Sequence, residues 1–145
     1  MKKVLLMSLA VGLTLLLTAC GKDNKITNRL VCTQNAAGVD VELTTNFQGN
    51  KIYDMDLKYT MNLSEYSDVQ INAIKEQDFC TIVKNAMAGF KEAFTNCKQS
   101  LNNKELLITS KLDVTKVSEG TVKQEGSIEE AKEGLESQGY KCVIK

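Results

Sequence analysis

Hydrophobic and polar residues alternate in the first half of the chain, and this pattern predicts β-strands with one buried face. We expect a first strand at Thr27–Gln34, a hairpin loop at Asn35–Gly38 and a second strand from Val39 to Phe47. A third strand, from Tyr53 to Leu63, follows a turn at residues 48–50. The residues expected to face the core in the second and third strands are Val39, Val41, Leu43, Thr45, Phe47, Tyr53, Met55, Leu57, Tyr59, Met61 and Leu63. One-sided alternation is typical of an antiparallel sheet whose other face is in water.

The period of the pattern then changes from that of a strand to that of a helix. Ser67 followed by Gln70 has the form of a capping box at a helix start. The apolar residues that recur at helical spacing are Ile71, Ile74, Phe79, Val83, Ala86, Phe90 and Phe94. We expect an amphipathic helix from about Asp68 to the low nineties, either unbroken or broken once, with Gly89 as the candidate break.

A second hairpin is expected from Cys97–Leu101 and Glu105–Val114, around the polar residues 102–104. Residues 115–126 are mostly polar and include two glycines, so we expect a loop there.

Ser127 with Glu130 forms a second capping-box pattern, which predicts a short helix over Ile128–Gln138. Gly139 is suited to stop that helix, and the tail Tyr140–Lys145 is either an edge strand or coil. The pattern therefore predicts one α+β domain over residues 27–145. Its antiparallel sheet, of about five strands, is expected to be covered on one face by the long helix and the short C-terminal helix.

The start of the chain has the layout of a secretory signal. Lys2 and Lys3 precede an apolar run of 14 residues from Val4 to Leu17, and small residues follow. Leu17–Cys20 (LTAC) resembles the lipobox of bacterial lipoproteins, in which the cysteine receives acyl chains such as palmitate and becomes the first mature residue. We therefore expect a signal peptide at residues 1–19, lipid attachment at Cys20 and a lipidated tether at residues 20–26.

The alternative for residues 1–19 is a membrane span. A helix of the 14 residues in the apolar run reaches about 21 Å at ~1.5 Å per residue, whereas a bilayer core of ~30 Å needs about 20 residues. A span would also leave Cys20 without a role. The expected location is thus the extracytoplasmic surface of a cell membrane, with the membrane itself as a partner through the lipid.

Charge and composition narrow the functions further. The chain has 18 basic and 18 acidic residues, and loss of Lys2 and Lys3 with the signal would leave a small acidic excess. This balance gives no indication of nucleic-acid binding. The chain contains no histidine, which excludes the common hydrolase triads. We predict no catalytic residues, no metal site and no cofactor.

Four cysteines remain besides Cys20, and an even number in an exported protein suggests two disulfides. These candidates are Cys32, Cys80, Cys97 and Cys142. The alternative is that they are free buried thiols. A Cys80–Cys97 bridge is out of reach if the helix runs unbroken to Phe94, and becomes possible if Gly89 ends it. The other two connectivities join Cys32 to Cys80 or to Cys97, so all three stay open.

Three other groups of side chains have a functional and a structural interpretation. Asp54 and Asp56 share the outward face with Asp40 and Glu42, where they form either a Ca²⁺ site or a solvated surface, and the latter is favoured. A basic strip for an anionic ligand would need four lysines that are scattered among acidic residues: Lys51, Lys58, Lys104 and Lys111. An adaptable pocket would use three methionines that are better explained as core: Met55, Met61 and Met87.

Three short stretches carry a resemblance to a known family. Phe47–Ile52 (FQGNKI), Glu129–Gly134 (EEAKEG) and Gln138–Lys141 (QGYK) are similar to segments of the YehR-type small bacterial lipoproteins. The resemblance implies the same order of strands and helices behind a lipobox, in a domain without an assigned function. The four additional cysteines depart from the family pattern, and the resemblance provides no catalytic residue and no disulfide pairing.

Together these features predict a lipid-anchored envelope protein whose domain is not an enzyme and binds an envelope protein partner. The alternative is a carrier that holds a small ligand or lipid in a cavity between the sheet and the helix.

Overall fold

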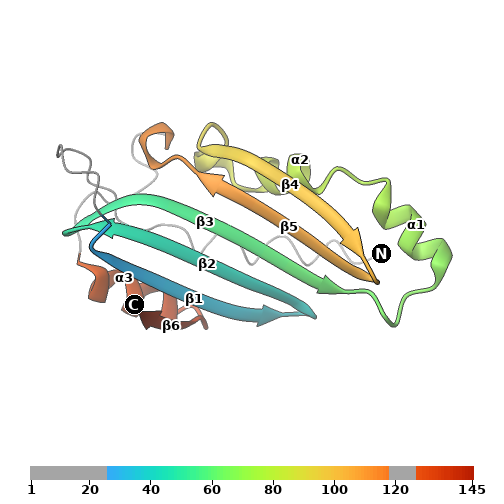
Figure 1. The fold of residues 1–145 in the computed structure, drawn as a ribbon, viewed down its shortest axis with the longest axis horizontal. Helices are drawn as coiled ribbons and strands as arrows, with labels where there is room; N and C mark the ends of the chain where they lie inside the picture. The colour runs from blue at the N-terminus through green and yellow to red at the C-terminus, as the bar shows by residue number, and fades with distance from the viewer. Residues whose placement is uncertain (1–25, 118–126) are drawn as a thin grey trace.

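The computed structural model describes residues 26–117 and 127–145, so Cys20, the signal peptide and most of the tether lie outside the described residues. These residues form a six-stranded antiparallel sheet with strand order β4-β5-β3-β2-β1-β6 (Figure 1). The strands are β1 (Asn28–Ala36), β2 (Val39–Gln48), β3 (Lys51–Asn62), β4 (Phe94–Asn102), β5 (Glu105–Leu112) and β6 (Lys141–Ile144). The helices are α1 (Asp68–Lys75), α2 (Phe79–Ala86) and α3 (Ile128–Glu136), with 3₁₀ turns η1 (Ala88–Phe90) and η2 (Val114–Lys116).

The α+β class is confirmed, and the sheet has six strands because the tail is an edge strand paired with β1. Two of the hairpins turn in two residues. Ala37 and Gly38 join β1 to β2, and Asn103 and Lys104 join β4 to β5, all with positive φ. Positive φ at both central residues matches the right-handed twist of paired strands. The expected loop at residues 115–126 begins with η2, and residues 118–126 lie outside the described residues.

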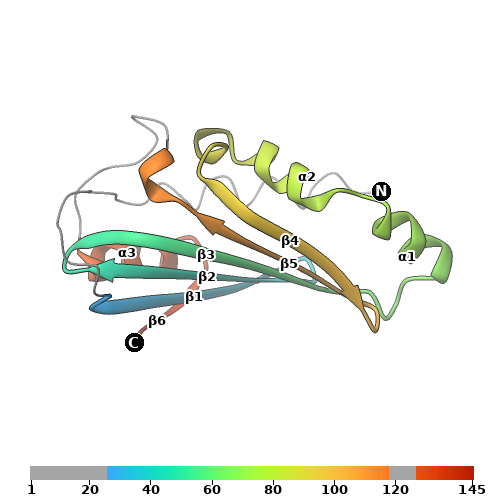
Figure 2. The same ribbon diagram turned by 45° about the horizontal axis from the view of Figure 1, so that its top comes forward.

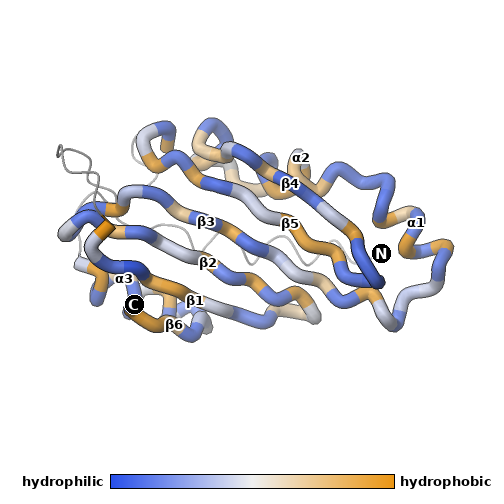
Figure 3. Tube along the Cα trace, viewed as in Figure 1, coloured by the Kyte–Doolittle hydropathy of each residue, from blue (hydrophilic) through white to orange (hydrophobic). Residues whose placement is uncertain are grey.

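Hydrophobic and polar residues alternate along β2 and β3 (Figure 3), and most of the apolar ones are buried in the core. One position of β3 departs from the pattern. Asn46 is opposite Asp54 but Phe47 is opposite Ile52, so Tyr53 occupies a bulge. Ile52 takes the core position, and Tyr53 is 43% exposed. The prediction that Tyr53 faces the core was therefore wrong.

The expected long helix is two short helices. The first ends at Lys75, and the second begins at Phe79 after Asp78, whose side chain accepts a hydrogen bond from the Thr81 amide at 3.0 Å. The side-chain amide of Gln99, in β4, also accepts from the Phe79 amide and donates to the Gln77 carbonyl, at 2.8 and 2.9 Å. These bonds satisfy main-chain groups that a helix break leaves open. The break therefore lies at residues 76–78, and Gly89 belongs to η1.

The three helices cover the core face of the sheet to different extents. The α3 helix packs behind β1 and β6 through Ile128, Ala131 and Leu135 (Figure 2). The α2–η1 segment packs on β4 and buries Val83 and Phe90. By contrast, α1 buries no residue and lies beyond the end of the sheet (Figure 1). Of the expected long helix, only the α2–η1 segment covers the core face, and the C-terminal helix α3 covers another part of it.

Both capping boxes and the glycine stop are confirmed. Ser67 with Gln70 begins α1, and Ser127 with Glu130 begins α3. After α3 the chain reverses at Gly139, which has φ +91°. A Cβ there would lie 3.1 Å from the Gln34 side-chain nitrogen, so both conformation and space favour glycine.

The four candidate cysteines form two disulfides, Cys32–Cys142 and Cys80–Cys97. The second is within reach because the helix that carries Cys80 ends at Ala86. Cys32 and Cys142 are directly opposite each other on the paired strands β1 and β6. Each disulfide thus ties a secondary-structure element at one edge of the sheet to its neighbour.

The two bridges are expected to differ in their effect on stability, because loop length sets the entropy that a cross-link removes from the unfolded chain. The Cys32–Cys142 bridge spans 110 residues and the Cys80–Cys97 bridge spans 17. Replacing the first pair by alanine should lower the free energy of unfolding by about 5 kcal/mol, and replacing the second by about 3 kcal/mol. Urea unfolding of the two double variants measures the difference, and a larger loss for the Cys80/Cys97 pair would contradict it.

Candidate functional site

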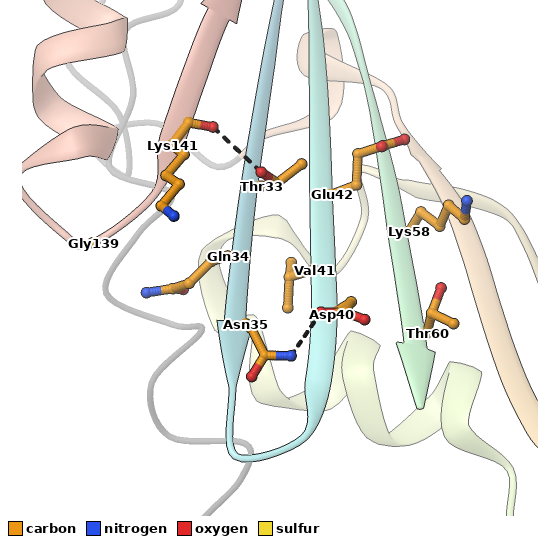
Figure 4. A pocket seen from close by; sticks show the side chains of 10 residues that line it. All are labelled: Thr33, Gln34, Asn35, Asp40, Val41, Glu42, Lys58, Thr60, Gly139 and Lys141. Atoms are coloured by element: carbon orange, nitrogen blue, oxygen red, sulfur yellow. Dashed lines mark hydrogen bonds between the residues drawn. The ribbon is translucent and has the colours of Figure 1, made fainter. Parts of the chain in front are cut away.

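The face of the sheet opposite the core is polar, and among the described residues α2 and α3 pack against the other face. Near the β1–β2 turn this face is hollowed over β1, β2 and β3, with Lys141 of β6 at one side (Figure 4). This first hollow has a volume of about 600 Å³ and is lined by Thr33, Gln34, Asn35, Asp40, Val41, Glu42, Lys58, Thr60, Gly139 and Lys141. Asn35 donates a hydrogen bond to Asp40 at 2.7 Å and so fixes one carboxylate at its rim.

A second hollow of about 510 Å³ continues from the first and shares Glu42 and Lys58 with it. It extends over β5 and β4, where Thr109, Lys98 and Lys111 line it. We call the two together the polar groove. Because the groove reaches from β6 to β4, every strand of the sheet contributes at least one side chain to it.

A chain of polar side chains borders the polar groove and crosses four strands. Arg29 of β1 donates to the Asn46 side chain at 2.9 Å, and Asn46 in turn donates to Asp54 of β3. Lys111 of β5 forms ion pairs with Asp54 at 3.3 Å and with Asp56 at 4.0 Å. Asn46 is buried under these neighbours although its side chain is on the polar face. The bonds hold neighbouring strands in one arrangement across the groove border.

Burial and neighbouring charges shift the pKa values of two side chains in this polar chain, Asp56 and Lys111. Partial burial raises the pKa of Asp56, and the nearby Lys111 ammonium opposes that rise. The carboxylate of Asp54 is the main cause that raises the pKa of Lys111. At neutral pH the lysine therefore stays charged between its two acidic neighbours.

The register separates the acidic residues that a Ca²⁺ site would need. Glu42 is opposite Lys58, whereas Asp54 is opposite Asn46 and Asp56 is opposite Thr44. Within residues 26–117 and 127–145, no group of three metal-ligating side chains comes together. On this face Asp54 and Asp56 form ion pairs with Lys111, and Asp40 accepts a hydrogen bond from Asn35.

The lysines and methionines also have structural roles. Lys111 is engaged by the two aspartates, and Lys104 pairs with Asp68 at 3.8 Å near the β4–β5 turn. Met55 and Met87 are buried in the core, and Met61 packs against it. Of the lysines in the basic strip, Lys58 and Lys111 line the second hollow together and Lys104 pairs with Asp68, while the methionines belong to the core.

One buried polar group was not singled out by the sequence pattern. The hydroxyl of Tyr59, on the core face of β3, is buried and has no hydrogen-bond partner among the residues that the structure describes. Burial is the main cause that raises the pKa of Tyr59, and Tyr140 adds to the rise. The alternating pattern predicted that Tyr59 faces inward, but it could not show whether the hydroxyl would find a partner.

Comparison with known proteins adds one structural likeness. No family model matches the chain, and no curated protein matches it. The NMR structure of a protein from Streptococcus pneumoniae TIGR4 is similar at 14% sequence identity, with a TM-score of 0.41. The match covers 86% of this chain and 75% of that one. The resemblance to YehR-type lipoproteins stays a prediction. Among the described residues no helix is long and apolar enough to cross a membrane.

The buried hydroxyl of Tyr59 leads to a pH-dependent prediction. A raised pKa means that the folded state disfavours the phenolate. Stability should therefore be complete below the ordinary tyrosine pKa of 10.0 and fall as the pH rises above it. Tyr59→Phe should raise the free energy of unfolding by up to about 1 kcal/mol at neutral pH and weaken the alkaline loss.

Urea unfolding at neutral and alkaline pH tests this expectation, with the exposed Tyr53→Phe as the matched control. A loss of stability for Tyr59→Phe at neutral pH would show instead that the hydroxyl makes a stabilising hydrogen bond.

Proposed function

We propose that this protein is a lipid-anchored component of the cell envelope whose folded domain is a non-enzymatic binding module. The anchor is assigned to Cys20 within the lipobox-like Leu17–Cys20 stretch, so the domain works on the extracytoplasmic side of a membrane. Its partner is an envelope protein that recognises the polar face of the sheet.

The observation that supports binding is the polar groove. It is open to solvent and brings both signs of charge onto a rigid sheet, with Asp40 and Glu42 beside Lys58 and Lys141. Mixed charges on a preformed surface favour one orientation of a charged partner and repel others. The groove is also large enough, at about 600 Å³ in its first part, to receive side chains of a partner.

The residues of the polar groove suit binding better than turnover. General acid–base chemistry needs a group whose pKa is tuned near neutrality and which has access to substrate. Two groove carboxylates already have partners within the protein, since Asp40 accepts a hydrogen bond from Asn35 and Asp56 forms an ion pair with Lys111. Nucleophilic catalysis would need an activating base, and the chain has no histidine to provide one.

A second candidate is a carrier that holds a small ligand on the core face, between the sheet and the helices. The observation that favours it is the buried Tyr59 hydroxyl, which has hydrogen-bonding capacity that a ligand oxygen could use. The two hollows of the polar groove lie on the opposite face of the sheet, so the binding module is the better-supported function.

The anchor can be tested by the intact mass of the protein taken from its native membrane. The mass should equal residues 20–145 plus acyl groups, and it should rise by about four daltons on reduction, because each of two disulfides takes up two hydrogens. A mass that retains residues 1–19 would refute lipoprotein processing.

The binding surface can be tested by photo-crosslinking in cells. A photoreactive amino acid at Thr60, which lines the polar groove, should give a discrete adduct with an envelope protein. The same probe at Ala73, exposed on α1, is the matched control and should not give that adduct. Glu42→Lys should reduce the Thr60 adduct severalfold, because it reverses a groove charge.

Identical adducts from Thr60 and Ala73 would argue against the polar groove as the binding surface. Turnover of an envelope substrate by the purified protein would instead make it an enzyme.

A further inference from the structure

One corner of the sheet combines exposed apolar and basic side chains. It covers the start of β1 and the whole of β6, on the side of the sheet away from α1 (Figure 1), and it shares Lys141 with the polar groove. Three of its side chains are exposed hydrophobics: Ile26 (39%), Val143 (58%) and Ile144 (38%). Its basic residues are Arg29, Lys141 and Lys145. We call these six residues the β1–β6 corner.

The β1–β6 corner is held by main-chain bonds and by the sheet register. Arg29 and Lys145 exchange hydrogen bonds, 2.9 Å from the Arg29 amide and 2.7 Å from the Lys145 amide. The two residues, with Ile26, line a shallow hollow of about 230 Å³. Val143 is opposite Val31 on β1, so its side chain is on the same face as those of Lys141 and Lys145.

The charged side chains of the two strands at this corner are all basic. Strands β1 and β6 contain Arg29 and Lys141 and no acidic residue, and Lys145 follows β6 directly. The bond from the Arg29 Nε to Asn46 orients the guanidinium on the polar face. The corner is therefore suited to an anionic partner that also accepts apolar side chains.

The covalent reach of the tether places this corner close to the lipid. Six residue steps separate Cys20 from Ile26. A fully extended chain of that length covers about 20 Å at ~3.3–3.6 Å per residue. Acylation of Cys20 would therefore keep Ile26 within that distance of the headgroup layer, whereas the far end of the sheet has no such restraint.

From these observations we propose that the β1–β6 corner is a membrane seat, which docks the domain onto anionic phospholipid headgroups. This inference rests on the proposed lipid anchor and adds an orientation to it. The basic residues attract anionic headgroups, and the isoleucine and valine side chains enter the interfacial layer. A covalent anchor alone would not fix the orientation of the domain, whereas the seat holds one end of the sheet at the bilayer.

A second copy of the chain fits the same corner less well. The edge of β6 offers main-chain groups to another strand. However, antiparallel pairing of two copies about Val143 would place Lys141 opposite Lys145 of the second copy. Like charges directly opposite on paired strands are destabilising, so the phospholipid surface is the occupant that the charges favour.

Lysine footprinting on vesicles tests the membrane seat. The lipidated mature protein is placed in vesicles of phosphatidylcholine alone or of an equal mixture with phosphatidylglycerol, and acetylation of each lysine is followed by mass spectrometry. On the anionic vesicles Lys141 and Lys145 should react about fivefold more slowly, the factor expected for one basic residue at an anionic surface. Lys98 and Lys104, on and beside β4, should react equally on both vesicles.

Two exposed valines provide matched variants. Val143→Asp places a negative charge in the corner and should remove the protection of Lys145, whereas Val69→Asp changes a 79% exposed valine on α1 and should leave the protection unchanged. Lys145→Gln, read at Lys141, is a second variant that leaves the apolar residues in place and should weaken the protection there about fivefold.

The other outcomes are distinguishable. Equal reactivity of Lys141 and Lys145 on both kinds of vesicle would overturn the seat, while flotation of the protein with the vesicles would leave the anchor intact. Failure to float would overturn the anchor and the seat together. Protection that persists in detergent and grows with protein concentration would identify a second copy as the occupant and overturn the lipid assignment.

Discussion

A row of buried side chains across the centre of the sheet is the constraint on which the rest of the structure depends. Cys142, Cys32, Leu43, Leu57 and Ser110 are opposite one another on five successive strands, and all are buried. A shift of any strand by one residue would turn its apolar side chains into water. The row therefore fixes the register of the sheet, and with it the positions of the charged residues on the other face.

The two edges of the sheet differ in how far they are covered by other parts of the chain. The β4 edge is joined to α2 by Cys80–Cys97 and by the Gln99 side chain, which bonds to main-chain groups at the helix start. The β6 edge has exposed side chains among the described residues. An exposed edge invites pairing with other chains, and Lys141 within β6, with Lys145 just after it, is the kind of residue that discourages such pairing.

The sequence predicted those features that depend on residues close together in the chain. Alternation located the first three strands, and local side-chain bonds located the starts of α1 and α3. The break before α2 was missed because Gln99, which bonds to Gln77 and Phe79, is about twenty residues further along the chain. The bulge at Tyr53 was missed for a related reason, since it depends on how β2 and β3 pair, and a single strand does not reveal its partner.

For the candidate site as well, the sequence predicted the residues of a face but not which of them are neighbours across strands. The sequence identified the acidic and basic residues of the polar face and left their arrangement open. Only the register showed that Glu42 is opposite Lys58 and that Asp54 and Asp56 share Lys111. The cysteine pairing was likewise left open, because it depends on where a helix ends and on whether the tail joins the sheet. Cross-strand neighbours, rather than residue types, therefore decide what this surface can bind.

The Cys32–Cys142 bridge has a consequence for how the molecule tolerates damage. It closes a covalent ring that contains the greater part of the folded domain, since its two cysteines are 110 positions apart. A protease that cuts once anywhere within that ring yields two segments that remain one molecule. The sheet holds the segments together through main-chain pairing, and the bridge does so even when pairing is lost for a moment. With the proposed lipid anchor at Cys20, a copy that is cut once within the ring would stay attached to the membrane.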